Sequence, residues 1–321
     1  NTLKLSVIMP SYNHGRYIGE ALGAIVNQSF EPFEVIVCDD GSTDDSAEII
    51  QRFADKYKFI RLVKNGANRG VFVSIERLVE LSRGDYLYFA AADDMILPGL
   101  FERSIKMLGR YPQAGLCCSD VVNFSDIKGF SHIKRSYLGG KTRYLSAEEV
   151  VETVRKTGGG ISPVTCLIKR SAFVEAGGYI PELKWNCDWF LICIISFRYG
   201  ICYIHEPLAS QRIRKESYSF IGGCNWKLRK EVAINIVRSV ELPVYENVQS
   251  GFKRSYCMAV FGIPMLFAFF VRRKYLKYIS LSMVLRALWN EFLLFAGLNT
   301  PSFVKMACYR FLKTLYINSK V

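Results

Sequence analysis

Two adjacent carboxylates, Asp93 and Asp94, follow an apolar run at residues 86–90 that is typical of a buried strand. Neighbouring carboxylates repel each other, so such a pair is most stable beside a cation or hydrogen-bond donors. A hard divalent ion that also contacts phosphate oxygens meets this need. The alternative is a helix start, because Asp often caps a helix and an apolar-periodic segment follows Pro98. The pair therefore indicates a metal–phosphate site or a helix cap.

A second acidic segment begins where the apolar run at residues 33–38 ends, with Asp39 and Asp40. A carboxylate at this place can accept hydrogen bonds from a ligand. The alternative is again structural, because Ser42 or Asp44 can cap the helix that follows. Ligand binding and helix capping are both open for this segment.

The elements around these acids are predicted to alternate between strand and helix. Expected strands lie at residues 3–9, 33–38, 60–63, 86–90, 116–124, 164–169 and 201–204, with helices after the first four and at residues 146, 171 and 185–198. Such alternation predicts an α/β fold with a mostly parallel sheet and helices on both faces. The loops at the carboxyl ends of the strands form the ligand crevice in such folds, so the acids lie on the functional face.

The net charge of +13 is concentrated at the end of the chain. Residues 225–321 hold 15 Lys and Arg against 4 Asp and Glu, a balance of +11. The same region contains a charge-free run at residues 255–271 and aromatic-rich amphipathic segments at residues 279–298 and 301–317. These features predict helices that lie on an anionic membrane surface. A membrane span at residues 255–271 and a soluble helical cap are the alternatives, and nucleic acid is not expected because the apolar content is too high.

Other site classes find little support in the sequence. The ten cysteines include no Cys-x-x-Cys pair and the three histidines are scattered, so a zinc site is not predicted. No phosphate-binding loop of the ATPase type or dinucleotide fingerprint is present. Buried reduced cysteines are typical of a reducing compartment, and the run at residues 3–9 is too short for a secretory signal. We therefore expect a cytoplasmic protein at the inner face of the membrane.

Three segments together resemble the family 2 glycosyltransferases with the GT-A fold. They are Val-Ile-Met-Pro-Ser-Tyr-Asn at residues 7–13, Asp-Asp-Gly-Ser-Thr-Asp at residues 39–44, and Ala-Asp-Asp at residues 92–94 before Pro98. The resemblance covers about residues 3–220, divided into a nucleotide-sugar half (1–115) and an acceptor half (116–224), with residues 225–321 as a basic helical region. It implies an inverting, metal-dependent enzyme that moves a sugar from a nucleotide-diphosphate donor, most commonly a UDP-sugar, to an acceptor hydroxyl.

The resemblance also implies which residues bind the donor. Asp39 and Asp40 would hold the nucleotide, with Pro10, Tyr12 and Asn13 around the base. Asp93 matches the metal-binding acid, with Mg²⁺ or Mn²⁺ bridging to the diphosphate. The chain departs from the pattern at Ala91, where many members carry a further Asp. Arg214 stands where many members have His and would clamp the diphosphate, the alternative being a solvated basic loop.

The acceptor half would supply the base. Asp188 matches the family's acid at the start of the helix at residues 185–198, and Cys187 replaces a second acid before it. Burial between Trp185 and Trp189 should raise the pKa of Asp188, and these indoles could stack on a sugar. Glu182 is the alternative base.

Three functions are open from the sequence. The membrane-binding tail favours a glycosyltransferase acting on a glycan or lipid-linked glycan, as in bacterial surface-polysaccharide assembly. A binding or scaffold protein that has lost its chemistry at Ala91, Cys187 and Arg214 is the alternative. Nucleotidyl transfer is disfavoured, because residues 10–15 provide no Gly-rich basic loop.

Overall fold

The computed structural model describes residues 3–125 and 129–299 of the chain. The strands are β1 (Leu5–Ser11), β2 (Glu34–Asp39), β3 (Ile60–Lys64), β4 (Tyr86–Phe89), β5 (Met95–Ile96), β6 (Leu116–Ser125), β7 (Phe130–Lys134), β8 (Arg143–Leu145), β9 (Leu167–Lys169) and β10 (Ile201–Arg212). The α-helices are α1 (Gly15–Val26), α2 (Ser46–Lys56), α3 (Val71–Leu81), α4 (Leu100–Arg110), α5 (Ala147–Thr157), α6 (Arg170–Glu175), α7 (Cys187–Tyr199), α8 (Tyr218–Cys224), α9 (Trp226–Val240), α10 (Glu246–Ser255), α11 (Ile263–Phe269) and α12 (Leu281–Asn299).

The strands form one mixed sheet in the order β3-β2-β1-β4-β9-β6-β10-β5, with β7 beside β6 and β8 beside β10. β1, β2, β3 and β4 are mutually parallel, as the alternating pattern predicts, whereas β9 lies antiparallel between β4 and β6. The short strands β5, β7 and β8 were not predicted. The last strand, expected at residues 201–204, continues to Arg212 and pairs antiparallel with β5. This extension brings the segment after β10 beside Asp93 and Asp94.

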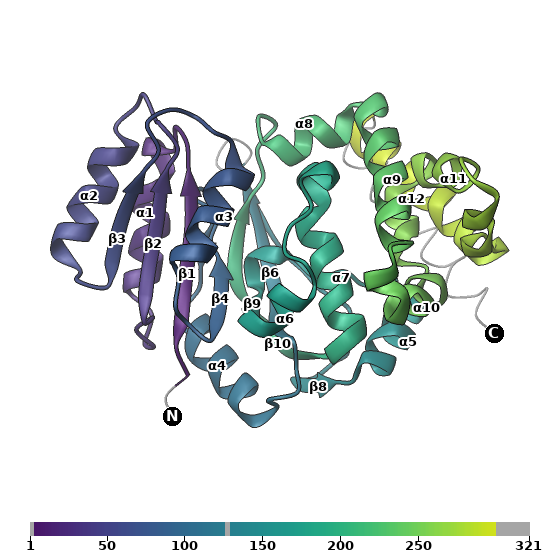
Figure 1. Ribbon diagram of the computed structural model, residues 1–321, viewed down its shortest axis with the longest axis horizontal. Coiled ribbons are helices and arrows are strands. Elements are labelled where there is room, and N and C mark those ends of the chain that lie inside the picture. Colours follow the sequence, from purple (N-terminus) through teal and green to yellow (C-terminus); the bar gives the residue numbers. More distant parts are fainter. Residues whose placement is uncertain (1–2, 126–128, 300–321) are drawn as a thin grey trace.

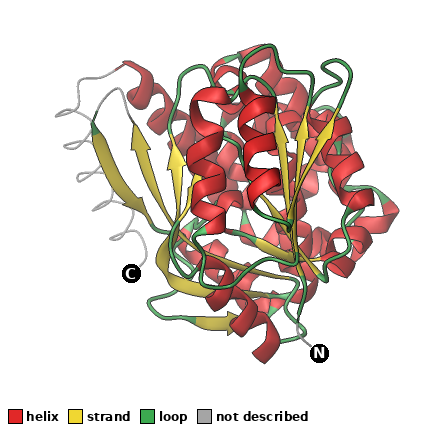
Figure 2. Ribbon diagram, turned by 90° about the vertical axis from the view of Figure 1, so that its left-hand side faces the viewer, coloured by secondary structure: helices red, strands yellow, loops and turns green. Residues whose placement is uncertain are grey.

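Helices cover both faces of the sheet, as Figure 2 shows. The side chains of β1 alternate between two buried clusters, with Val7 in one and Ile8 in the other. The cluster that contains Val7 includes residues of α1, α2 and α4. The cluster that contains Ile8 includes residues of α3, α5, α6, α7 and α9 to α12. The predicted helix start at Ser146 is confirmed, since Ser146 and Glu149 form a capping box.

The helices after residue 225 lie at the end of the molecule opposite β3 (Figure 1). They share a core with the sheet, because Phe252 of α10 packs its ring against Phe190 and Phe197 of α7. Arg254 of α10 also forms ion pairs with Glu148 and Glu152 of α5. A chain shortened at residue 250 would therefore lose part of its core, and the surface of this region is better tested by single substitutions.

The charge-free run at residues 255–271 is divided and largely buried. It forms a 3₁₀-helix (Cys257–Phe261), a break at Gly262 with φ 66°, and then α11. Met258, Met265 and Phe269 are among its residues in the core. In the part of the chain that the structure describes, no helix combines the length and the apolar character needed to cross a membrane. The amphipathic segment expected at residues 301–317 lies outside the described residues.

Candidate active site

The acids singled out in the sequence follow the carboxyl ends of β2 and β4, at the upper edge of the sheet in Figure 1. Asp39 ends β2 and is paired in register with Ser11, which ends β1. Its side chain is buried, and its Oδ2 atom accepts a hydrogen bond from the backbone N–H of Ser42 at 3.2 Å. Neither Oδ1 of Asp39 nor Oγ of Ser11 has a hydrogen-bond partner among the described residues, although both atoms are buried. Because burying an unpaired polar atom is costly, these two atoms indicate a ligand with a donor group.

Asp40 uses both oxygens within its own chain. Oδ1 accepts hydrogen bonds from Nδ2 of Asn65 at 2.7 Å and from the backbone N–H of Arg69 at 3.0 Å, and Oδ2 accepts from the N–H of Gly70 at 2.8 Å. The Asp40 carboxylate therefore fixes the loop between β3 and α3. The donor-binding role predicted for Asp40 stays a prediction, and the structure assigns its side chain a positioning role in this loop.

Asn13 joins the loops that follow β1 and β2. Its Oδ1 atom accepts a hydrogen bond from the backbone N–H of Thr43 at 2.8 Å, and its own N–H donates to Oγ of Ser42 at 2.9 Å. Asp44 adds bonds from the N–H groups of Gly15 at 2.9 Å and Ser46 at 3.0 Å. Asp44 thus contacts the first turns of α1 and α2, while the N-cap position of α2 is Asp45.

Asp93 lies beside Arg214, and the two side chains form an ion pair that is mostly buried. The neighbouring Asp94 accepts a hydrogen bond from the backbone N–H of Arg212 at 2.8 Å through Oδ1. Burial, and secondarily the charge of Asp93, raises the pKa of Asp94 to about 7. The guanidinium of Arg212 pairs with Glu20 and stacks on the ring of Tyr17. The structure thus brings together Asp93 and Arg214, which the sequence separates by 121 positions.

His14 belongs to this cluster, although the sequence analysis treated it as an isolated histidine. Burial lowers the pKa of His14, and Asp93, Arg214 and Asp44 are the charged groups that act on it. A neutral imidazole at this place can donate or accept a hydrogen bond, or ligate a metal. The signal that could have found it is its position at the end of β1, one residue after Asn13.

The described residues offer few side chains that could hold a divalent metal ion. Within residues 3–125 and 129–299, no three His, Cys, Asp or Glu side chains converge on a point that could hold a metal ion. Mg²⁺, however, is commonly held by one or two carboxylates together with substrate phosphates. Asp93 supplies one such carboxylate, and its charge is balanced by Arg214 before any ligand is present. A diphosphate adds two negative charges and a divalent ion removes them, so the residues fit a metal that arrives with the donor.

Asp188 occupies a contrasting environment at the first turn of α7. Its Oδ1 atom accepts a hydrogen bond from the N–H of Trp189 at 2.5 Å. Burial raises the pKa of Asp188 to about 6, and among the described residues no cation opposes that shift. Tyr179 lies beside this carboxylate and packs on Phe89, the last residue of β4, with ring centroids 5.1 Å apart. The direction of this pKa shift agrees with the expectation, but the neighbours of the carboxylate are Tyr179 and Cys166. The role of Asp188 as the base stays a prediction, and the alternative base Glu182 is exposed.

The aromatic residues predicted at the site differ in their availability. Tyr12 is 41% exposed and Pro10 is half-buried, so both are accessible at the end of β1. The Trp189 ring packs edge-on against Phe261, with centroids 4.7 Å apart. Trp185 lies against α8, where only a glycine fits at residue 222, because a Cβ atom there would come within 2.3 Å of the indole.

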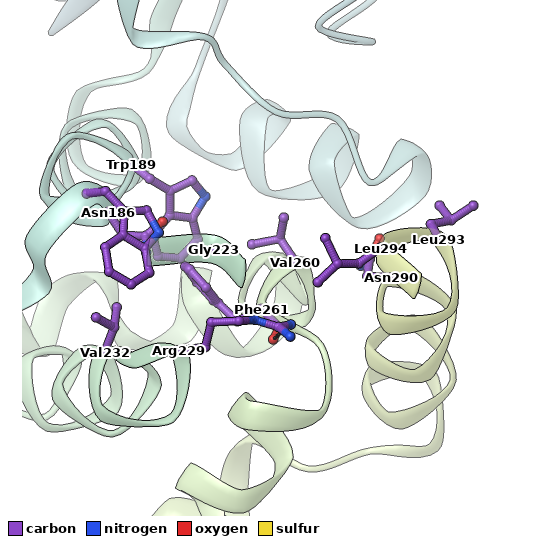
Figure 3. A pocket seen from close by; sticks show the side chains of 11 residues that line it. Asn186, Trp189, Gly223, Arg229, Val232, Val260, Phe261, Asn290, Leu293 and Leu294 are labelled. Atoms are coloured by element: carbon purple, nitrogen blue, oxygen red, sulfur yellow. Dashed lines mark hydrogen bonds between the residues drawn. The ribbon is translucent and has the colours of Figure 1, made fainter. Parts of the chain in front are cut away.

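Trp185 and Trp189 also line a cavity of about 440 Å³ between α7, α9 and α12. Figure 3 shows its walls, which include Phe261 and Leu294. The indoles of Trp185 and Trp189 therefore line this cavity and contact the helices that follow residue 217. The stacking of a sugar on these indoles stays a prediction.

Comparison with known proteins relates the chain to one family. The family model described as glycosyl transferase family 2 matches residues 6–176, more than half of the chain. An uncharacterized glycosyltransferase of Haemophilus influenzae is 28% identical over 225 residues, which are 67% of this chain and 81% of the relative. The uncharacterized glycosyltransferase YibD of Escherichia coli is 37% identical over 107 residues, 33% of this chain and 31% of the relative.

Solved structures have a similar fold at low sequence identity. TarS 1–349 of S. aureus, in complex with UDP-GlcNAc, aligns with a TM-score of 0.59 and 16% identity over 92% of each chain. The mannosyltransferase PcManGT of Pyrobaculum calidifontis, in complex with GDP-Man and Mn²⁺, aligns with a TM-score of 0.51 and 16% identity over 99% of this chain and 81% of that one. At this identity the likeness concerns the fold.

Proposed function

Because the chain belongs to glycosyl transferase family 2, we propose that it transfers a sugar from a nucleotide-diphosphate donor to an acceptor hydroxyl with inversion at the anomeric carbon. The observation that carries the donor site is the buried carboxylate of Asp39, whose Oδ1 atom has no partner among the described residues. A uracil N–H or a ribose hydroxyl would supply the missing donor. The UDP-GlcNAc bound by the TarS structure supports a UDP-sugar as the first candidate.

The donor's diphosphate would lie between Asp93 and Arg214. Arg214 can bind phosphate oxygens in a two-point contact once a ligand competes with Asp93 for its guanidinium. Asp93 would then hold Mg²⁺ or Mn²⁺ together with the diphosphate, and such an ion stabilises the charge that develops on the leaving group. His14, kept neutral by burial, is the neighbouring group that can contact the phosphates or their ion.

Asp188 would act as the general base. Its carboxylate takes the proton of the acceptor hydroxyl, while that oxygen attacks the anomeric carbon from the face opposite the diphosphate. The bond between the sugar and the diphosphate breaks, and the nucleoside diphosphate leaves with the electron pair. A base whose pKa is about 6 is ionised at neutral pH yet holds a proton more readily than an exposed Asp. The proton then passes to solvent.

The acceptor would be a lipid-linked glycan presented at a membrane surface. Phe267, Phe270 and Val271 are 51%, 71% and 43% exposed, and the exposed cations Arg272 and Arg273 follow directly. Apolar side chains beside cations favour an anionic bilayer surface. A nucleotide-sugar donor supports the cytoplasmic face, so we propose a peripheral protein at the inner side of the membrane.

Calorimetry with a panel of nucleotide sugars, each with and without Mn²⁺, tests the donor site. We predict that Asp39→Asn weakens the affinity for the preferred donor about 10- to 100-fold, because a buried charged acceptor is lost. Asp55→Asn is the control, since Asp55 is an exposed acid of α2. Absence of binding to any nucleotide sugar by the wild-type protein would instead favour a binding or scaffold protein on this fold.

A further inference from the structure

We propose that the cavity between α7, α9 and α12 binds an aliphatic chain, namely the apolar segment of the acceptor molecule. This inference rests on the proposed function, and it assigns a ligand to a part of the molecule that the donor chemistry does not use. The cavity measures about 440 Å³, a volume within the range of ligand pockets.

The walls of the cavity are mainly apolar. Trp185, Trp189, Val232, Phe261, Leu293 and Leu294 supply most of its lining. Figure 3 shows these side chains contributed by α7, α9, α12 and the segments between them. A methylene chain that moves from water into this cavity would contact aromatic and branched aliphatic side chains. The hydrophobic effect favours such a transfer in proportion to the apolar area that is buried.

Two polar side chains of the lining, Arg229 and Asn290, are already paired within the protein. The lining also includes the amide of Asn186 and the indole N–H groups of Trp185 and Trp189. Arg229 forms two hydrogen bonds with Glu291, Nη1 to Oε1 at 2.8 Å and Nη2 to Oε2 at 2.7 Å. Glu291 Oε2 also accepts a hydrogen bond from the N–H of Ile263 at 3.1 Å, and Nδ2 of Asn290 donates to the carbonyl of Ala259 at 3.0 Å. The charge of Arg229 is therefore balanced by Glu291, and the described residues that line the cavity include no free cation.

This pairing decides between the possible ligands. A phosphate would have to displace Glu291 from Arg229, and a sugar would bury hydroxyls that find few partners. Trp189 is also engaged edge-on by Phe261, which occupies ring surface that a sugar would need. An uncharged aliphatic chain carries neither cost, so it is the ligand that these walls favour.

The position of the cavity connects it to both the site and the surface. Trp189 of the lining is the residue after Asp188, so the cavity and the proposed base share the first turn of α7. On the outer side, α12 presents Leu288, Phe292 and Phe295 to solvent at 46%, 41% and 62% exposure. The helix α12 therefore supplies both apolar residues of the cavity wall, Leu293 and Leu294, and exposed apolar residues that a membrane-embedded chain can contact.

Quenching of tryptophan fluorescence by 11-bromoundecanol tests the assignment, because two of the four tryptophans line the cavity. We expect saturable quenching of the full-length protein, and the affinity of unbrominated n-alkanols in competition should rise about four-fold per added methylene. Leu294→Glu, which places a charge in the wall, should weaken the affinity at least 10-fold. Leu285→Glu is the matched control, since Leu285 is a 58% exposed residue of the same helix and does not line the cavity.

Val260→Phe, at a 55% exposed position of the lining, narrows the cavity without adding charge and should also weaken quenching, which covers the case that Leu294→Glu does not fold. Equal quenching of Leu294→Glu, Val260→Phe and Leu285→Glu overturns the assignment. So does tighter calorimetric binding of methyl β-glucoside than of undecanol. Nucleotide-sugar binding, measured on the same samples, should be unchanged in all variants. If the wild-type protein bound no nucleotide sugar, the proposed function would be contradicted, and the quenching result alone would show whether the cavity binds an aliphatic chain.

Discussion

The strand-end loops and the helices after residue 180 differ in how many hydrogen-bond donors surround their polar side chains. In the loops after β1, β2 and β4, Asn13, Asp40 and Asp44 each accept hydrogen bonds from the backbone N–H groups of neighbouring segments. Around α7, the Asp188 carboxylate lies among Tyr179 and Cys166, with the N–H of Trp189 as its bonded donor. The first region uses Asp40 and Asp44 to build shape, although burial also raises the pKa of its Asp94 to about 7, and the second isolates one acid.

This difference separates binding from reactivity. A carboxylate that accepts several N–H bonds is well stabilised as an anion, which suits a fixed loop and a poor proton acceptor. A carboxylate that is buried with little compensation holds a proton more readily, which suits a general base. The acids of the donor half would thus orient the nucleotide, and Asp188 would move the proton.

The largest expected effect comes from removing the isolated acid. Asp188→Asn should lower turnover about 10²- to 10⁴-fold while leaving donor affinity unchanged, since its proposed role is proton transfer. Glu182→Gln, at the exposed alternative base, is the control and should keep near-normal turnover. The measurement is steady-state transfer with calorimetry of the donor; a collapse of donor affinity in Asp188→Asn would make Asp188 a donor ligand.

The same variant has a signature in stability. The pKa of Asp188 is raised by folding to about 6, so between pH 4 and 6 the folded protein binds a proton that the unfolded chain releases. This group therefore makes stability fall as pH rises through that window, and kcat should rise through about pH 6 as the base ionises. Asp188→Asn should remove the part of that pH dependence that Asp188 causes, leaving the part due to Asp94, and should raise the free energy of unfolding at pH 7 by about 2–3 kcal/mol. Thermal unfolding at pH 5 and pH 7 measures it.

Removing a shape-building acid should have the opposite result. Asp40→Ala deletes the acceptor for Asn65, Arg69 and Gly70 and should lower the free energy of unfolding by about 2–3 kcal/mol. Donor affinity would fall with it as the loop between β3 and α3 loosens. Asp45→Ala, at an exposed residue without a side-chain capping bond, is the control for denaturant unfolding. Undiminished stability of Asp40→Ala would mean that the contrast between the regions is overstated.

The ion pair of Asp93 and Arg214 sharpens the contrast, because it joins the loop after β4 to the segment after β10 yet is proposed to open on binding. Asp93→Ala should weaken donor binding about 10- to 100-fold and remove its dependence on Mn²⁺, since Ala91 cannot replace the carboxylate. Arg214→Ala should weaken donor binding but keep its dependence on Mn²⁺. Calorimetry of both single variants and the double variant with UDP and Mn²⁺ gives the coupling. Metal dependence that survives in Asp93→Ala would rule out Asp93 as the ligand.

Much of the donor half could be predicted from the sequence because its signals are local. A short apolar strand that ends at Asp39, or that is followed four residues later by Asp93, places the acid at the sheet edge, whichever side chains surround it. What this pattern could not show is where each oxygen points. Asp39 and Asp40 are neighbours in the same motif, yet Asp40 bonds to the loop that lies 25 to 30 residues downstream, while Asp39 keeps one oxygen without a partner among the described residues.

The helices after residue 180 could not be predicted to the same extent, since their contacts join segments that are distant in the sequence. The cavity brings Trp185 together with Leu294, and the charge-free run at residues 255–271 is buried by contacts that its own composition does not reveal. β9, an antiparallel strand inserted between β4 and β6, likewise depends on tertiary pairing. His14 was missed because its neighbours Asp93 and Arg214 come from other loops.

The smallest expected effect concerns membrane binding by the exposed surface of the helices after residue 225. Arg273 is exposed and follows the exposed pair Phe270 and Val271, so it would face lipid headgroups if this surface binds a bilayer. One cation near an anionic surface contributes about 1 kcal/mol, so Arg273→Gln should weaken binding to phosphatidylserine-containing vesicles about five-fold. Lys58→Gln, an exposed cation of the donor half, should leave vesicle binding unchanged. Co-sedimentation at low and high salt measures both, and because Phe270 and Val271 add an apolar contribution, salt should weaken the attachment of the wild-type protein without abolishing it. Equal effects of the two substitutions would mean that vesicle binding depends only on the net charge of the protein. The proposal that the helices after residue 225 face the membrane would then be wrong.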